Sequence, residues 1–137
     1  MKNSTTVILL VFGLLFLGCE SKPQWNKWQV GDILFQNGDC GDFCDAIKKV
    51  TSGYNGHSFS HNGILIEENG NWRVLEAVNQ GVQITALEDF LNRYTTEEGK
   101  PKVHVGRLKP SYQDLIPDAI AFGKTLKGKP YDQAFNL

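Results

Sequence analysis

Residues 60–78 of this 137-residue chain read SHNGILIEENGNWRVLEAV. Two segments of this stretch, 61–67 and 72–78, are rich in β-branched, aliphatic and aromatic residues and lie on either side of Asn69-Gly70. Asn-Gly between two such segments is a strong signal for a β-hairpin, because both residues tolerate the positive φ angles of a tight turn. We therefore predict that the two segments are antiparallel neighbours in a sheet.

The register of this hairpin brings a histidine and a glutamate together. With a loop of two or four residues, Gly63 lies opposite Glu76, and His61 lies opposite Val78. Since side chains alternate between the faces of a strand, His61 and Glu76 then point to one face as diagonal neighbours, with Cα atoms ~7–8 Å apart. Such a pair can be a general base with its orienting group, or a structural histidine beside an incidental carboxylate. The pattern alone leaves both interpretations open.

The rest of the chain alternates signals for strands and helices. Apolar segments at 30–35, 81–84 and 103–108 predict further strands. Helices are expected at 42–50, at 85–94 after a capping-box pattern that starts at Thr85, and from Ser111 to a stop at Gly128. Strands mostly in sequence with helices packed to one side predict an α+β fold.

The N-terminus has the pattern of an export signal. Lys2 is followed by an unbroken run of eleven apolar or glycine residues at 7–17, which fits a signal peptide and is too short for a membrane span of ~20 residues. The sequence Phe16-Leu-Gly-Cys19 resembles the lipobox of bacterial lipoproteins, in which the cysteine is lipidated and becomes the mature N-terminus. The alternative is an ordinary secretory signal with an incidental cysteine. We expect a lipoprotein signal peptide at 1–18, and a lipidated Cys19 with its tether at 19–28.

The charge of the chain argues against a nucleic-acid partner. Removal of residues 1–18 takes away one of the 14 basic residues, so that 13 remain against 15 acidic residues. Proteins that bind nucleic acid usually present a strongly basic face, which a small negative net charge does not supply. We expect a single domain over residues 29–137.

Four segments carry a resemblance to a known family. They are Gly31-Asp-Ile-Leu-Phe35, Ser60-His-Asn-Gly-Ile64, Val74-Leu-Glu-Ala77 with Gly81-Val82, and Gly128-Lys-Pro-Tyr-Asp132. In this order they resemble the motifs of the permuted NlpC-like, papain-like cysteine hydrolases, the YiiX/YebB-like amidases. The resemblance implies a papain-like α+β domain with an antiparallel sheet and packed helices.

The resemblance also implies a mechanism. It makes His61 the general base and Glu76 the group that orients it, and it makes Tyr131 and Asp132 candidates for the substrate site, unless they only form a turn after Pro130. In the permuted group a Cys-Ser-Glu-type segment with the nucleophile follows the Pro-Tyr-Asp stretch, whereas this sequence ends in Gln-Ala-Phe-Asn-Leu. We therefore expect that the nucleophilic cysteine is not present in this chain, that the domain is incomplete at its C-terminus, and that residues 1–137 alone are inactive.

Cys40 and Cys44 leave three possibilities open. Cys44 lies near the start of the helix expected at 42–50, where the helix dipole favours a thiolate, so it could replace the missing nucleophile. However, only sixteen residues separate it from His61, which is cramped for a helix and a glycine-rich loop. A disulfide between the two cysteines is compatible with export, although it closes a tight loop, and two reduced thiols are equally compatible.

One cysteine and histidine spacing matches a two-Cys, two-His zinc finger, namely Cys40-x3-Cys44-x12-His57-x3-His61. Such a finger requires both histidines on one helix, whereas the segment from His57 to His61 follows glycines and leads into a strand. We therefore expect no metal and no cofactor. The alternative is structural zinc held by these four residues, which would remove His61 from catalysis.

These patterns predict a lipoprotein of the bacterial cell envelope, anchored to the membrane through lipidated Cys19 on the periplasmic side or the outer surface. The complete chain is expected to be a thiol hydrolase that cleaves amide or ester bonds, and the resemblance alone suggests peptides or acylated lipids as substrates. The rival hypothesis is a lipid-anchored binding module with an incomplete, inactive catalytic site.

Overall fold

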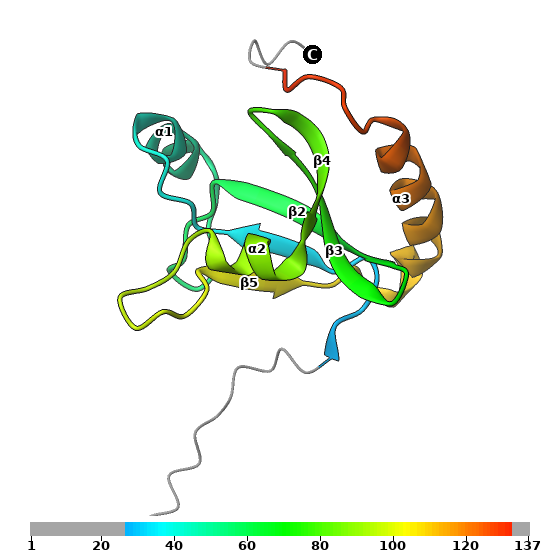
Figure 1. The fold of residues 1–137 in the computed structure, drawn as a ribbon. Helices are drawn as coiled ribbons and strands as arrows, with labels where there is room; N and C mark the ends of the chain where they lie inside the picture. Colours follow the sequence, from blue (N-terminus) through cyan, green and yellow to red (C-terminus); the bar gives the residue numbers. More distant parts are fainter. Residues whose placement is uncertain (1–26, 133–137) are drawn as a thin grey trace, which may run out of the picture.

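A computed structural model describes residues 27–132, so that the expected signal peptide, Cys19 and most of the expected tether lie outside the described residues. Within this part of the chain, the strands form one antiparallel sheet in the order β4-β3-β2-β1-β5 (Figure 1). The strands are β1 (Ile33–Gln36), β2 (His61–Glu68), β3 (Asn71–Val78), β4 (Gly81–Ala86) and β5 (Val103–Gly106). The helices are α1 (Asp42–Val50), α2 (Leu87–Asn92), the 3₁₀ helix η2 (Pro110–Leu115) and α3 (Ile116–Thr125). None of the helices within 27–132 has the length and apolar character that crossing a membrane requires.

The central hairpin has the predicted register. Asn69 and Gly70 link β2 to β3, and their φ angles of 52° and 76° are those of a tight two-residue turn. Gly63 faces Glu76 in the resulting pairing, as predicted. On the other side of β2, strand β1 places Gln36 directly opposite His61. Strands β1, β2 and β3 therefore meet at the His61 end of the hairpin.

One face of the sheet carries the main hydrophobic core. The buried residues of this core are Leu34, Leu65, Val74, Leu87, Phe90 and Val103, with Trp28, Trp72 and Leu91 packed against them. Helix α2 supplies two of the buried residues, so this short helix covers the core face beside the hairpin. Because side chains alternate along a strand, His61 shares the face of Leu65, and Glu76 shares the face of Val74. The predicted pair therefore lies at the edge of the core.

Helix α3 packs on the opposite face of the sheet, beside β3 (Figure 1). Gly123 approaches Leu75 so closely that an added β-carbon would lie 2.6 Å from the leucine Cδ2 atom. Leu75 is the neighbour of Val74 in β3 and so points away from the core face. Lys124 of the same helix pairs with Glu68 of β2 at 2.7 Å. The sheet is thus covered on both sides, by α2 on one and by α3 on the other.

Several predicted boundaries differ from the structure. The capping-box prediction is wrong, because Thr85 belongs to β4, and α2 begins at Leu87 without a side-chain cap. The Thr85 hydroxyl instead binds Glu76 of the adjacent strand, so a tertiary contact replaces the local one. The first strand begins at Ile33, after a turn in which the Asp32 amide donates to the Gln29 carbonyl. The last predicted helix is divided into η2 and α3.

Candidate active site

Strands β2 and β3 bring the side chains of His61 and Glu76 into contact. His61 Nε2 lies 2.6 Å from Glu76 Oε2, which is the distance of a short, charge-assisted hydrogen bond. The Glu76 side chain is fully buried, whereas 22% of the His61 side chain is exposed. The predicted diagonal contact is therefore confirmed. Because Nε2 faces Glu76, Nδ1 is the ring nitrogen left for the solvent side.

Glu76 accepts further hydrogen bonds from α2 and β4. Arg93, which follows the last residue of α2, donates from Nη1 to Oε2 at 2.9 Å and from Nη2 to Oε1 at 2.6 Å. The Thr85 hydroxyl donates to Oε1 at 2.5 Å, and Gln83 Nε2 approaches the same oxygen at 3.4 Å. Burial by itself raises the pKa of the Glu76 carboxyl, but the hydrogen bonds that it accepts, first of all from Arg93, outweigh burial and hold this pKa well below its usual range. Glu76 is therefore a carboxylate at neutral pH.

Phe90 of α2 lies against two of the partners of Glu76, His61 and Arg93. Its ring is fully buried, and its centroid lies 5.9 Å from the centroid of the His61 ring. The guanidinium carbon of Arg93 lies 5.3 Å from the same Phe90 centroid, within the range of a cation–π contact. One short helix thus supplies the apolar support for the histidine and the cation that binds the glutamate.

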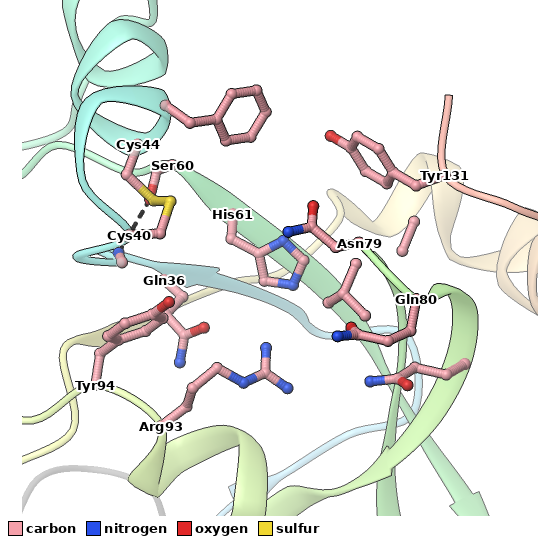
Figure 2. Close-up of a pocket in the computed structure, with 15 residues that line it drawn as sticks. Gln36, Cys40, Cys44, Ser60, His61, Asn79, Gln80, Arg93, Tyr94 and Tyr131 are labelled. Atoms are coloured by element: carbon pink, nitrogen blue, oxygen red, sulfur yellow. Dashed lines mark hydrogen bonds between the residues drawn. A yellow bond between two sulfur atoms is a disulfide. The ribbon is translucent and has the colours of Figure 1, made fainter. Parts of the chain in front are cut away.

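A pocket of about 360 Å³ lies beside His61 (Figure 2). Its lining comes from the end of β1, the loop after it, the turn between β3 and β4, and the end of α2, and includes Gln36, Ser60, Asn79, Arg93, Tyr94 and Tyr131. Of the described residues that line the pocket, only Arg93 carries a permanent charge, and Glu76 neutralises that charge. The pocket is therefore polar and aromatic but close to neutral.

Gln36 places a buried acceptor beside the histidine. Its side chain is fully buried, and its Nε2 donates to the Phe90 carbonyl at 2.8 Å, which fixes the orientation of the amide. Its Oε1 has no hydrogen-bond partner among residues 27–132. A buried acceptor without a partner costs ~1–3 kcal/mol, so a donor that forms a hydrogen bond with this oxygen would recover that free energy.

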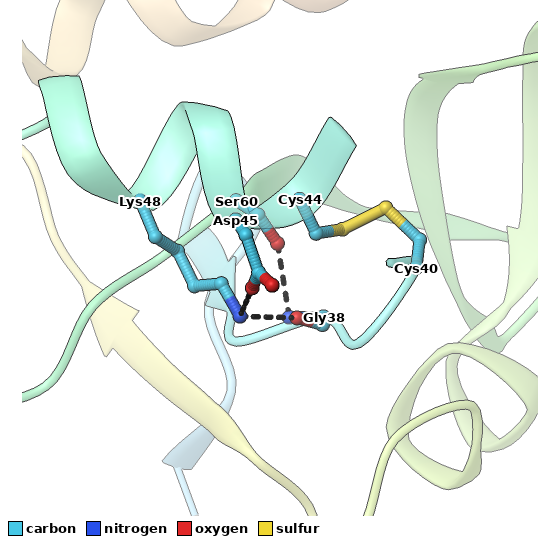
Figure 3. The surroundings of a disulfide bond; sticks show 6 residues. All are labelled: Gly38, Cys40, Cys44, Asp45, Lys48 and Ser60. Atoms are coloured by element: carbon cyan, nitrogen blue, oxygen red, sulfur yellow. Dashed lines mark hydrogen bonds and ion pairs between the residues drawn. A yellow bond between two sulfur atoms is a disulfide. The ribbon is translucent and has the colours of Figure 1, made fainter. Parts of the chain in front are cut away.

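The two cysteines after β1 form a disulfide bond (Figure 3). Their Cα atoms are 5.2 Å apart, which is within the normal range for a disulfide, and both residues line the pocket. Of the three possibilities that the sequence left open for Cys40 and Cys44, the structure contains the disulfide. In this state Cys44 has no thiol with which to attack a substrate.

The loop that carries the disulfide is also held by polar contacts (Figure 3). The Gly38 amide donates to Ser60 Oγ at 3.0 Å, and Lys48 Nζ of α1 donates to the Gly38 carbonyl at 3.3 Å. Lys48 also pairs with Asp45 of its own helix at 2.9 Å. These contacts tie the loop at Gly38 to Lys48 in the last turn of α1 and to Ser60, the residue before His61, so the loop forms a fixed wall of the pocket.

The residues with zinc-finger spacing do not form a ligand cluster in this structure. Both sulfur atoms are in the disulfide, and His61 contacts Glu76. The ring of His57 instead lies 4.2 Å from the ring of His104 on β5, measured between centroids. Within residues 27–132, no group of three or more histidine, cysteine, aspartate or glutamate side chains is placed to hold a metal ion.

The segment after α3 returns to the pocket. Val82 of β4 donates its amide to the Lys129 carbonyl at 2.9 Å and accepts from the Gly128 amide at 2.8 Å, so the segment runs along β4. Tyr131 lines the pocket, whereas Asp132 is not among the lining residues (Figure 2). The structure therefore brings one of the two candidate substrate-site residues to the pocket.

Sequence reasoning missed three residues that bind Glu76, namely Gln83, Thr85 and Arg93. Gln83 faces Glu76 directly in the pairing of β3 with β4, and Thr85 lies two residues further along on the same face. The sequence did contain a signal for Gln83 and Thr85, because the two-residue link Asn79-Gln80 fixes the register of β3 with β4. Arg93 carried no such signal, since a strand pattern does not predict what a neighbouring helix contributes.

Comparison with models of protein families matches residues 27–137 to the family described as "Permuted papain-like amidase enzyme, YaeF/YiiX, C92 family". The match covers every described residue of the domain and well over half of the chain. A comparison with curated proteins gives no significant match. The antiparallel sheet with its packed helices has the α+β architecture expected of a papain-like domain.

Proposed function

Since the chain belongs to the family of permuted papain-like amidases (YaeF/YiiX), we propose that the pocket is the site of a cysteine hydrolase that cleaves amide bonds. In this proposal His61 is the general base and Glu76 orients it. The supporting observation is the 2.6 Å contact between His61 Nε2 and a buried carboxylate that other donors hold in place. A catalytic histidine needs one nitrogen held and the other available, and this contact leaves Nδ1 available.

The proposed reaction uses His61 twice. First, Nδ1 removes the proton from a cysteine thiol, and the thiolate attacks the carbonyl carbon of the substrate amide. When the tetrahedral intermediate collapses, the C–N bond breaks and the imidazolium gives its proton to the leaving amine. A water molecule, deprotonated by His61, then attacks the acyl-enzyme, which releases the carboxylic acid and restores the thiol. Glu76 stabilises the imidazolium that forms in both halves of the reaction.

The proposed nucleophile is a cysteine other than Cys40 and Cys44, which are joined to each other. The family resemblance places the nucleophile after the segment that ends at Asp132. The described part of this segment supports the proposal, because Tyr131 lines the same pocket as His61. The reading frame after the codon for Leu137 tests this point directly, since a Cys-Ser-Glu-type segment is expected there.

A thiol-directed covalent probe tests the mechanism on protein that includes this cysteine. We expect the probe to label one site in the wild type and to label His61→Ala far more slowly. The double variant Cys40→Ser/Cys44→Ser is the matched control, and it should be labelled at the wild-type site. Equal labelling rates in the wild type and in His61→Ala would contradict the proposal.

A lipid-anchored binding module without catalysis is the second candidate. It is favoured by one observation, namely that the cysteines within residues 27–132 are both oxidised and offer no thiol there. A stop codon directly after Leu137, together with absent probe labelling, would favour this candidate over the enzyme.

We further propose that the protein is anchored in the bacterial cell envelope through lipid on Cys19, where peptides or acylated lipids are the substrates. The support is the apolar run at 7–17 together with the lipobox-like sequence Phe16-Leu-Gly-Cys19, which overlaps the end of this run. Metabolic labelling with a clickable fatty acid should mark the wild type, and Cys19→Ser should lose both the label and the membrane fraction. A fatty-acid label retained in Cys19→Ser would overturn the assignment.

A further inference from the structure

Arg93 and His61 share the carboxylate of Glu76 between them. Oε2 receives His61 Nε2 and Arg93 Nη1, while Oε1 receives Arg93 Nη2 and the Thr85 hydroxyl. The two parallel contacts from the guanidinium form a fork, which fixes the plane of a carboxylate as well as its position. Rotation of the carboxylate toward another orientation would break contacts on both oxygens. The direction in which Glu76 presents an oxygen to His61 is therefore set by Arg93.

The charge of Arg93 has a consequence for the histidine. Without it, the buried Glu76 would have His61 as its nearest positive partner, and a buried carboxylate strongly favours the protonated form of an adjacent imidazole. A histidine that is always protonated cannot accept a proton from a thiol. With the guanidinium in place, His61 faces a neutral arginine–glutamate pair instead of an isolated negative charge.

We propose that Arg93 is a positioning residue of this site: its guanidinium locks the Glu76 carboxylate in one orientation and neutralises its charge, so that His61 is oriented without being held as an imidazolium. This assignment rests on the proposed role of His61 as base. Arg93 acts through Glu76, because both of its terminal nitrogens are engaged by that carboxylate.

The other groups around His61 do not offer the same compensation. Among the described pocket residues that titrate, Tyr94 follows Arg93 and Tyr131 follows α3, and tyrosine side chains are neutral near pH 7. Strand β1 contributes the uncharged Gln36, and the disulfide in the loop after it does not titrate. The balance of charge at His61 thus depends on Glu76 and Arg93 together.

The titration of the His61 ring tests the proposal without requiring the nucleophile. In ¹⁵N-labelled protein, ring nitrogen shifts report both the titration midpoint and the share of neutral rings that carry the proton on Nε2. Arg93→Gln should raise the midpoint of His61 by about one pH unit or more, equivalent to a tenfold gain in proton affinity. Arg93→Lys keeps the charge, so its midpoint should stay near that of the wild type. An ammonium group cannot hold both oxygens, so the Nε2–H share should fall in Arg93→Lys.

The matched control is Thr85→Val, which removes a neutral donor from the same carboxylate and should leave the midpoint nearly unchanged. An unchanged midpoint in Arg93→Gln, or a wild-type tautomer share in Arg93→Lys, would overturn the proposal. If Arg93→Gln fails to fold, the fraction of neutral His61 rings protonated on Nε2 in Arg93→Lys is sufficient to support or overturn the proposal. A failed covalent-probe experiment would instead refute the thiol mechanism, so the two failures are distinguishable.

Discussion

Replacement of Glu76 by glutamine removes a buried negative charge and nearly preserves the size of the side chain. In Glu76→Gln, Arg93 keeps its positive charge while its two hydrogen bonds to a carboxylate are lost. The NH₂ group of the new glutamine also replaces an accepting oxygen, so that it faces other hydrogen-bond donors. Loss of one partner from a buried ion pair costs ~3–5 kcal/mol. Since 27% of the Arg93 side chain is exposed and water can partly solvate it, we expect the lower end of this range, ~3 kcal/mol.

Urea and thermal unfolding at pH 7 measure this loss. In a domain of this size each kcal/mol lowers the melting temperature by ~4 °C or more, so a fall of ~12 °C is expected. The pKa of Glu76 is lower in the folded protein than its ordinary value of 4.5. The carboxylate therefore stabilises the fold fully above pH 4.5, and this contribution is lost as the pH falls below that value. The stability of Glu76→Gln should consequently decline less than that of the wild type between neutral and acidic pH.

Glu68→Gln is the matched control for this substitution. Glu68 pairs with Lys124 at 2.7 Å, but both side chains are about one-third exposed, and exposed pairs contribute little. We therefore expect Glu68→Gln to unfold almost like the wild type at pH 7. Similar losses of stability in the two variants, or a loss below ~1 kcal/mol in Glu76→Gln, would refute the reasoning that the Glu76 contacts form a buried charged network.

Three further outcomes are expected. Gly63→Ala should cost ~1–3 kcal/mol in urea unfolding, because its methyl group would overlap the Val74 side chain. It should also shift the NMR signals of His61 and Glu76, whose side chains lie on the same face. The turn variant Gly70→Ala, whose added methyl group meets open space, should leave those signals in place. Replacement of both disulfide cysteines by serine should lower the free energy of unfolding by ~2 kcal/mol, the value expected for so short a loop. Urea unfolding of the wild type under reducing and oxidising conditions checks this, and equal unfolding midpoints would contradict it. Desolvation, with a smaller effect of His57, lowers the pKa of His104 in the folded state. The free energy of unfolding should therefore decrease as the pH falls below 6.5, the ordinary value for histidine. In His104→Phe this decrease should be smaller.

The hairpin could be predicted because its register is determined locally. Asn69-Gly70 allows a tight turn with positive φ angles, and a two-residue loop leaves one possible pairing of the strands that follow. The alternation of side chains then decides that His61 and Glu76 share a face. Nothing from the rest of the fold was needed to bring the two side chains within reach of each other.

The remaining partners of Glu76 depend on contacts that local patterns do not contain. Thr85 fits a helix cap in sequence, yet its hydroxyl binds a carboxylate on the neighbouring strand, so the helix begins two residues later. Arg93 reaches Glu76 because α2 ends beside β3, and the end of a helix is poorly determined by sequence. The spacing of Cys40 and Cys44 was compatible with a thiol pair and with a disulfide, and only their separation in space distinguishes these states.

A second buried carboxylate in the same domain helps to interpret the pair of His61 and Glu76. Asp32 is 1% exposed, and Arg107 donates to its two oxygens at 2.7 and 2.8 Å. This site lies at the start of β1, and its charge is balanced by an arginine fork without a histidine. The Gln29 amide also donates to Asp32 Oδ2 at 3.0 Å, so a fork and one neutral donor are sufficient for this fold to bury a carboxylate. Glu76 has the same set without His61, namely the fork from Arg93 and the Thr85 hydroxyl, so the short contact with His61 is not needed to compensate the buried charge. Because burial of Glu76 does not require the His61 contact, that contact favours a catalytic role for the histidine over a purely structural one.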